Sequence, residues 1–128
     1  DKIMTITDLR GSVPKKSTLY KNMIEIESDE IFSIPSLTIT NGPVPTGFNG
    51  EMVSLIMTLK NYNLDINSFN FTYNGDSFIG EYRSTLINFG KPFDLGSKSS
   101  ALGSLIENSE CQGEIRFISK EDLIANCS

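Results

Sequence analysis

The stretch Glu51–Lys60, EMVSLIMTLK, decides the fold that the sequence predicts. Every second residue is apolar, so an extended chain would place these side chains in one row on one face. The opposite face is mixed rather than fully polar, because Met52 and Ile56 lie there among polar residues. We expect this stretch to be the clearest strand of the chain, with an inner row formed by Val53, Leu55, Met57 and Leu59.

A second alternating stretch runs from Ser68 to Tyr73 and ends at a turn signal. Asn74-Gly75 follows it at once, and the alternation resumes at Ser77–Ile79. Asparagine and glycine both accept the positive φ that a tight hairpin turn requires. The sequence therefore predicts a β-hairpin here.

Shorter alternating stretches lie along the rest of the chain. Pro35 predicts an edge position or a bend, because proline has no N–H to donate to a neighbouring strand. Residues 1–22 are expected to contribute an edge strand and a loop. Helical signals are limited to a turn that begins at Ser119 and a stretch, Leu102–Glu107, that fits a loop equally well. The candidate strands are Ile3–Thr7, Ile24–Glu27, Phe32–Ile34, Leu37–Ile39, Arg83–Ile87 and Glu114–Ile118.

Turn residues recur at short intervals between these candidate strands, which is typical of all-β domains. We expect residues 1–128 to form a single domain, an antiparallel β-sandwich of about seven or eight strands with at most one or two short helical turns. Its predicted inner face consists of Val53, Leu55, Met57, Leu59, Phe69, Phe71, Ile115 and Phe117.

The charge of the chain argues against nucleic acid as a partner. The formal net charge is −5, and the sequence pI is about 4.6. Such a surface repels phosphate backbones, and Lys15-Lys16 is the only adjacent basic pair. No apolar run is long enough to span a bilayer. If the protein is anchored to a membrane, we expect the anchor to precede Asp1.

Two cysteines, Cys111 and Cys127, lie near the C-terminal end. An even, minimal count predicts one disulfide and hence an oxidising compartment. The alternative is a pair of free thiols in a cytosolic protein. Closing a loop of this size would stabilise the fold by about 3 kcal/mol in the chain-entropy description.

Most catalytic chemistry is missing from the sequence. There is no histidine, so neither an imidazole base nor a nucleophile activated by histidine is available. We find no phosphate-binding glycine motif, and we expect no enzyme activity, no cofactor and no metal. Carboxylates alone leave two options, glycoside hydrolysis and a calcium site. The adjacent acidic pairs are Asp29-Glu30 and Glu121-Asp122, and Asp65-x-Asn67 is similar to the start of a calcium loop, whose glycine and distal glutamate are missing.

Three phenylalanines fall in segments rich in glycine and proline: Phe48, Phe89 and Phe93. Aromatic residues in loops either close the ends of a sandwich or contact a partner. Both alternatives are open at this point, and the three residues are the candidate partner contacts.

Part of the chain resembles a family of immunoglobulin-like, often lipid-anchored bacterial ectodomains of unknown function. This resemblance implies an immunoglobulin-like sandwich and a lipoprotein-like ectodomain. The chain departs from the family pattern at Glu107–Glu110, where a proline-glycine turn is usual, and in its cysteine pair. The matching motifs are Gly50-Glu51-x-Val53-Ser54-Leu55-Ile56-x-Thr58-Leu59-x-Asn61, Ser68-x-Asn70-Phe71, Tyr73-Asn74-Gly75 and Gly113–Phe117.

The C-terminal cysteines support a second resemblance. Their placement, with Leu123 shortly before Cys127, is similar to the C-terminal disulfide loop of type IV pilins. Runs such as Leu64–Ser68 also resemble the β-sandwich heads of archaeal filament subunits. The long hydrophobic N-terminal helix of pilins has no counterpart here.

These observations predict a non-catalytic binding or interaction domain of a secreted or surface-anchored protein. Its partner would be another protein, engaged through loops or a sheet edge. The alternative is a structural subunit of a pilus-like surface filament, which would act by self-association. The two readings differ in oligomeric state, because only a filament subunit forms polymers.

Overall fold

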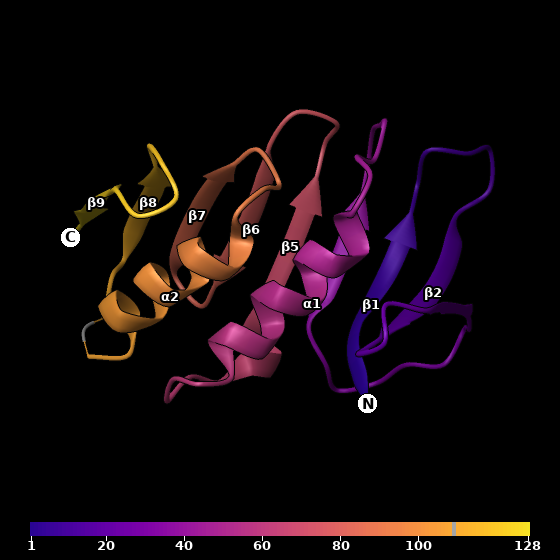
Figure 1. Ribbon diagram of the computed structural model, residues 1–128, viewed down its shortest axis with the longest axis horizontal. Helices are drawn as coiled ribbons and strands as arrows, with labels where there is room; N and C mark the ends of the chain where they lie inside the picture. The colour runs from indigo at the N-terminus through magenta and orange to yellow at the C-terminus, as the bar shows by residue number, and fades with distance from the viewer. Residues whose placement is uncertain (109) are drawn as a thin grey trace.

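In the computed structural model, residues 1–108 and 110–128 are described, and they form one mixed nine-stranded sheet with two α-helices on one face (Figure 1). The order of strands across the sheet is β3-β2-β1-β4-β5-β6-β7-β8-β9. The elements are β1 (Lys2–Asp8), β2 (Lys15–Tyr20), β3 (Glu25–Glu27), β4 (Ser36–Ile39), α1 (Phe48–Leu59), the 3₁₀ turn η1 (Ile66–Ser68), β5 (Phe69–Tyr73), β6 (Phe78–Tyr82), β7 (Thr85–Gly90), α2 (Leu95–Ile106), β8 (Gly113–Phe117) and β9 (Leu123–Cys127).

Strand direction explains why both helices cover the same face. Two β-α-β units, β4-α1-β5 and β7-α2-β8, each join neighbouring parallel strands. All four strands run the same way, because β6 is antiparallel to both β5 and β7. Both units also step in the same direction along the sheet. Crossovers of the same hand then bring both helices to one face and leave the other without a helix.

The core lies between the two helices and this face of the sheet. The strand residues that point toward the helices are mostly apolar and almost fully buried. Their neighbours on the opposite face are mostly half-buried or exposed, and Thr18, which is 1% exposed, is an exception. Aromatic rings line the centre of this layer, with Phe71 in contact with both Phe78 and Phe89. This arrangement buries one large cluster without a second sheet.

The predicted β-sandwich is therefore wrong, and so is the immunoglobulin-like architecture. The chain forms a single mixed sheet with a layer of two helices, not two antiparallel sheets packed face to face. Three of the strand pairings are parallel, which requires crossover segments that a purely antiparallel sandwich lacks. The apolar face of the sheet is covered by α1 and α2, where a sandwich would place its second sheet.

The main error concerns Glu51–Lys60, which belongs to helix α1 and its C-terminal cap. Val53 and Met57, predicted to lie in the inner row of a strand, are only half-buried. Met52 and Ile56, on the face expected to be polar, are fully buried. The buried residues of α1 recur every three or four positions, as one face of a helix requires. They are Phe48, Met52, Leu55, Ile56 and Leu59.

The expected helical turns and the expected edge strand differ from the structure, whereas most of the predicted inner-face residues are buried. Residues 102–106 end helix α2, where the sequence left a turn or a loop open. The helical turn expected after Ser119 gives way to strand β9. The expected N-terminal edge strand, β1, lies in the interior of the sheet between β2 and β4. Six of the residues predicted for the inner face are buried, namely Leu55, Leu59, Phe69, Phe71, Ile115 and Phe117.

The hairpin predicted at Asn74-Gly75 is confirmed, because β5 and β6 pair antiparallel across it. The Asn74 side-chain oxygen accepts hydrogen bonds from the backbone N–H groups of Asp76 (3.0 Å) and Ser77 (2.7 Å). Gly75 has φ +88°, and a Cβ there would lie 2.8 Å from the carbonyl oxygen of Gly42. Both conditions favour glycine at this position.

Candidate functional site

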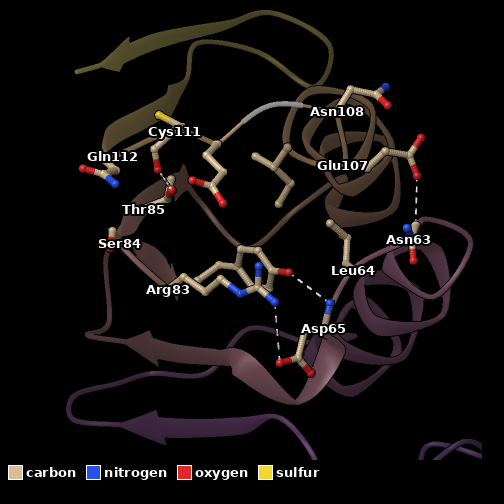
Figure 2. Close-up of a pocket in the computed structure, with 13 residues that line it drawn as sticks. Asn63, Leu64, Asp65, Arg83, Ser84, Thr85, Glu107, Asn108, Cys111 and Gln112 are labelled. Atoms are coloured by element: carbon tan, nitrogen blue, oxygen red, sulfur yellow. Dashed lines mark hydrogen bonds and ion pairs between the residues drawn. The ribbon is translucent and has the colours of Figure 1, made fainter.

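A polar hollow of about 680 Å³ opens at the end of the sheet where both helices end (Figure 2). Three connections form it: the segment between α1 and β5, the two-residue turn between β6 and β7, and the segment between α2 and β8. Its charged lining groups are Asp65, Arg83, Glu107 and Glu110. Three carboxylates and one guanidinium give the hollow a negative balance, so it favours polar or cationic ligands over anions.

Asp65 is held in place by several short contacts at the start of η1. Its backbone N–H donates to the Tyr82 hydroxyl oxygen (3.0 Å), and its carboxylate accepts a hydrogen bond from the Ser68 hydroxyl (2.6 Å). Arg83 Nη2 lies 3.8 Å from the same carboxylate. The Asp65 carboxylate therefore organises the local turn, and this structural role accounts for the aspartate in Asp65-x-Asn67 that is similar to the start of a calcium loop.

Glu107 closes the opposite side of the hollow. Its carboxylate accepts a hydrogen bond from the backbone N–H of Asn63 (2.9 Å), which joins the end of α2 to the segment after α1. Figure 2 shows Asp65 and Glu107 on different sides of the hollow, each with its own partners. Both carboxylates are thus already engaged in structural contacts.

The wall nearest β8 is fixed by the cysteines. As the sequence predicts, a disulfide joins Cys111 to Cys127, and their Cα atoms lie 4.8 Å apart. The Thr85 hydroxyl donates a hydrogen bond to the Cys111 carbonyl oxygen, and Ser128 bonds the Gln112 carbonyl through its N–H (3.1 Å) and its hydroxyl (2.8 Å). The disulfide indicates an oxidising, extracytoplasmic compartment.

The remaining acidic candidates do not form a reactive cluster. Asp29 and Glu30 lie in the connection between β3 and β4, and Glu121 and Asp122 lie in the turn between β8 and β9. In residues 1–108 and 110–128, no group of three or more cysteine, aspartate or glutamate side chains lies close enough to hold a metal ion. These four carboxylates lie outside the lining of the hollow.

One buried amine lies away from the hollow. Lys98 in α2 is 7% exposed, and its ammonium group donates to the carbonyl oxygens of Phe89 (2.8 Å) and Lys91 (3.1 Å). Burial lowers the pKa of Lys98, and the carboxylates of Asp94 and Glu51 oppose this shift. These contacts tie the first turns of α2 to the end of β7, which is a structural role.

The sheet face that points away from α1 and α2, here called the open face, has no covering helix in the part of the chain that the structure describes. Its side chains form two rows that cross the strands in register, and hydroxyl and amide groups dominate both rows between β1 and β5. Ser36 donates a hydrogen bond to the Asn70 side-chain oxygen (2.6 Å) across two of these strands. One row is Thr5, Ser36, Asn70, Glu81, Leu86, Glu114 and Asn126, and the other is Thr7, Thr38, Thr72, Ile79, Asn88, Arg116 and Ile124.

No family model, curated protein or solved structure matches the chain. Within the described parts of the chain, neither helix is long and apolar enough to cross a bilayer.

The candidate loop aromatics are placed differently from one another. Phe48 begins α1 and is 3% exposed, with its ring against Tyr73 and Phe78. Phe89 lies in β7 and is fully buried. Phe93 is 48% exposed in the turn before α2. Only Phe93 has a ring available to a partner, and its contact with one stays a prediction.

Sequence reasoning missed the open face, although part of the signal was present. Alternation along Ser36–Ile39 and Phe69–Tyr73 places small polar residues on one side of each strand. The same alternation fits a strand in a sandwich and a strand under a helix. Which strands lie side by side is set by crossovers, and local alternation carries no information on them.

Proposed function

We propose that the chain is a non-catalytic interaction domain of a secreted or cell-surface protein and that it binds a protein partner. The observation that carries this proposal is the open face. It spans strands from β1 to β9 and presents hydroxyl and amide groups interspersed with Ile79, Leu86 and Ile124. Interfaces between proteins that also exist separately are about as polar as the rest of the protein surface, so the composition of the open face is compatible with binding a protein.

Two further features support the proposal. The disulfide suits an extracytoplasmic protein that must persist in an oxidising environment. The absence of histidine and the engagement of Asp65 and Glu107 in structural hydrogen bonds leave the polar hollow better suited to binding than to catalysis.

Photocrosslinking in the organism that makes the protein tests the proposal. A photoreactive benzoylphenylalanine replaces Leu86, which is 42% exposed on the open face, and in a matched control it replaces Ser104, which is exposed on α2. We expect irradiation to give an adduct with a different protein at position 86 and little at 104. If position 86 yields no adduct, or if both positions yield the same adducts, the open face is not the binding surface.

The second candidate, a filament subunit, is favoured by one observation. The sheet is open, so β3 and β9 both end it with unpaired edges that copies of the chain could join. Sedimentation over a concentration series separates the two functions. A binding domain remains a monomer, whereas a filament subunit forms polymers that negative-stain electron microscopy would show.

A further inference from the structure

Strand β3 offers backbone groups to an additional strand. The Tyr20 N–H donates to the Ile24 carbonyl oxygen (2.9 Å), and the Ser28 N–H donates to the Lys16 carbonyl oxygen (3.1 Å). In an antiparallel pair, residues alternate between those whose backbone groups face the partner strand and those whose groups face away. The N–H and C=O groups of Glu25 and Glu27 therefore point away from β2, and no strand lies beyond β3 in the described sheet.

The two faces of this edge differ in chemistry. Ile24 and Ile26 are 54% and 52% exposed, and the register places Ile26 beside Thr18 on the side of the open face. Glu25 and Glu27 lie on the side of the helices, beside Leu19 and Ser17. An added strand would thus meet apolar side chains on one face and carboxylates on the other.

A hollow of about 410 Å³ lies next to the apolar side of the edge. It is lined by Tyr20, Ile24 and Ile26 together with Asp1, Lys21 and Asn22. Side chains of an added strand that point toward the open face would enter this hollow.

The charge of the edge selects among possible occupants. Glu25 and Glu27 are followed by Asp29 and Glu30, so β3 and the segment after it carry only negative charges, and Lys15 and Lys16 of β2 lie near Glu27 and Asp29. Pairing β3 with the same strand of a second copy would place carboxylates beside carboxylates, and like charges across a strand pair are destabilising. Strand β9 (Leu123–Cys127), the other edge, has no basic residue to match them.

We propose that the outer edge of β3 binds a strand of a partner protein whose residues alternate between apolar and basic side chains. The apolar side chains pack on Ile24 and Ile26, and the lysine or arginine side chains face Glu25 and Glu27. Strand addition of this kind draws affinity from backbone hydrogen bonds and specificity from alternate side chains. The inference rests on the proposed function, because it names the chemistry of the protein partner.

The test uses a short peptide, blocked at both ends, that alternates valine and lysine, and a second peptide with glutamate in place of lysine. Binding is measured by isothermal titration calorimetry, and amide exchange is followed by NMR. We expect the lysine peptide to bind at least tenfold more tightly than the glutamate peptide. We also expect it to slow exchange of the Glu25 and Glu27 amide protons.

Charge-reversed variants supply the matched control. Glu25→Lys/Glu27→Lys should reverse the preference, so that the glutamate peptide binds more tightly. Glu121→Lys/Asp122→Lys makes the same change of charge in the turn between β8 and β9, away from β3 and the open face, and should leave the preference for lysine unchanged. A fold check by circular dichroism accompanies each variant.

Three results would overturn the inference. Equal affinity for the two peptides, or no binding of either, removes the charge argument. Slowed exchange at β9 in place of β3 moves the site to the other edge. Dimers of the wild-type chain that the lysine peptide dissociates would assign the edge to a second copy. None of these results depends on the crosslinking at position 86. The proposal for the edge of β3 can therefore fail while the proposed function stands, and the reverse.

Discussion

At the scale of single residues, Asp8 and Arg10 form the most pH-sensitive contact at the end of β1. The Arg10 side chain donates to both carboxylate oxygens of Asp8, at 2.9 and 2.7 Å. This hydrogen bonding lowers the pKa of Asp8 below its ordinary value, and burial opposes the shift only in part. The pair is substantially exposed, so its contribution to stability is small, at most about 1 kcal/mol.

We predict that Arg10→Met raises the pKa of Asp8 toward its ordinary value. Because the folded-state pKa is lowered, the pair stabilises the fold above the unfolded-state pKa of Asp8, and this contribution is lost as the pH falls through the lowered value. The wild-type advantage over Arg10→Met in urea unfolding should therefore be present at neutral pH and vanish in acid. An NMR titration of the Asp8 carboxyl measures the shift directly.

The control for this prediction is Lys91→Met, which removes the partner of Asp76 instead. It should leave the titration of Asp8 unchanged. If Arg10→Met leaves the pKa of Asp8 at its wild-type value, the hydrogen bonds from Arg10 do not cause the shift.

Single residues also show which parts of the site the sequence could predict. Cys111 and Cys127 could be paired because their number alone suggests a partner for each. The burial of Phe48 and Phe89 could not be predicted, since turn residues nearby suggested loops where a helix and a strand form. Asp65 is among the acidic candidates of the sequence, whereas Glu107 is not. The hydrogen bond from Ser68 to Asp65 belongs to a local turn, and the one from Asn63 to Glu107 joins residues distant in the chain.

At the scale of elements, the contact between α1 and α2 depends on small side chains. Gly96 faces Ser54, and a Cβ at Gly96 would lie 2.6 Å from its hydroxyl oxygen. A Cβ at Gly103 would overlap the ring of Tyr62, with 2.6 Å to Cγ and Cε2. The Tyr62 hydroxyl is also hydrogen-bonded to Ser100 (2.8 Å), which holds the ring against α2.

We predict that Gly103→Ala destabilises the chain although alanine favours helix. The overlap with Tyr62 should lower the free energy of unfolding by about 1–3 kcal/mol. The higher helix propensity of alanine should raise it by about 1 kcal/mol. Chemical unfolding should therefore show a lower free energy of unfolding. In a Tyr62→Ala background the overlap is gone, so Gly103→Ala should be neutral or stabilising. The same loss in both backgrounds would show that Tyr62 is not the cause.

These glycines also explain why α2 was not predicted as a helix. Leu95–Ile106 contains two glycines and four serines, residues with modest helix propensity, and Lys98 lies on its buried face. In the sequence of α1, every second residue from Val53 to Leu59 is apolar, and so are residues spaced three or four apart. The period of a strand and the period of a helix therefore both fit this stretch. The packing of both helices on a shared apolar sheet face decides between them, and this information is not local.

At the scale of the whole molecule, strand order determines which surfaces are free. The hairpin of β5 and β6 was predictable because Asn74-Gly75 joins neighbouring strands. The parallel neighbours β1 and β4 were not, because the chain first forms β2 and β3 and then returns past the start of β1 (Figure 1). This return makes β3 an edge and turns the acidic stretch Glu25–Glu30 into a rim.

The last prediction concerns self-association at this edge. Charged residues on edge strands prevent pairing between copies. β3 carries two, Glu25 and Glu27, at the positions whose backbone groups point away from β2. Glu25→Gln/Glu27→Gln removes the repulsion. The one amide oxygen left at position 25 can still accept the hydrogen bond from Ser17, while the bond from Asn49 to the other Glu25 oxygen is lost. We expect sedimentation velocity to show concentration-dependent dimers for this variant and monomers for Glu81→Gln/Glu114→Gln, which has the same change of charge elsewhere. If this variant stays monomeric at every concentration, the short length of β3, and not its carboxylates, keeps copies apart. The argument that the charge of β3 excludes a second copy would then lose its basis.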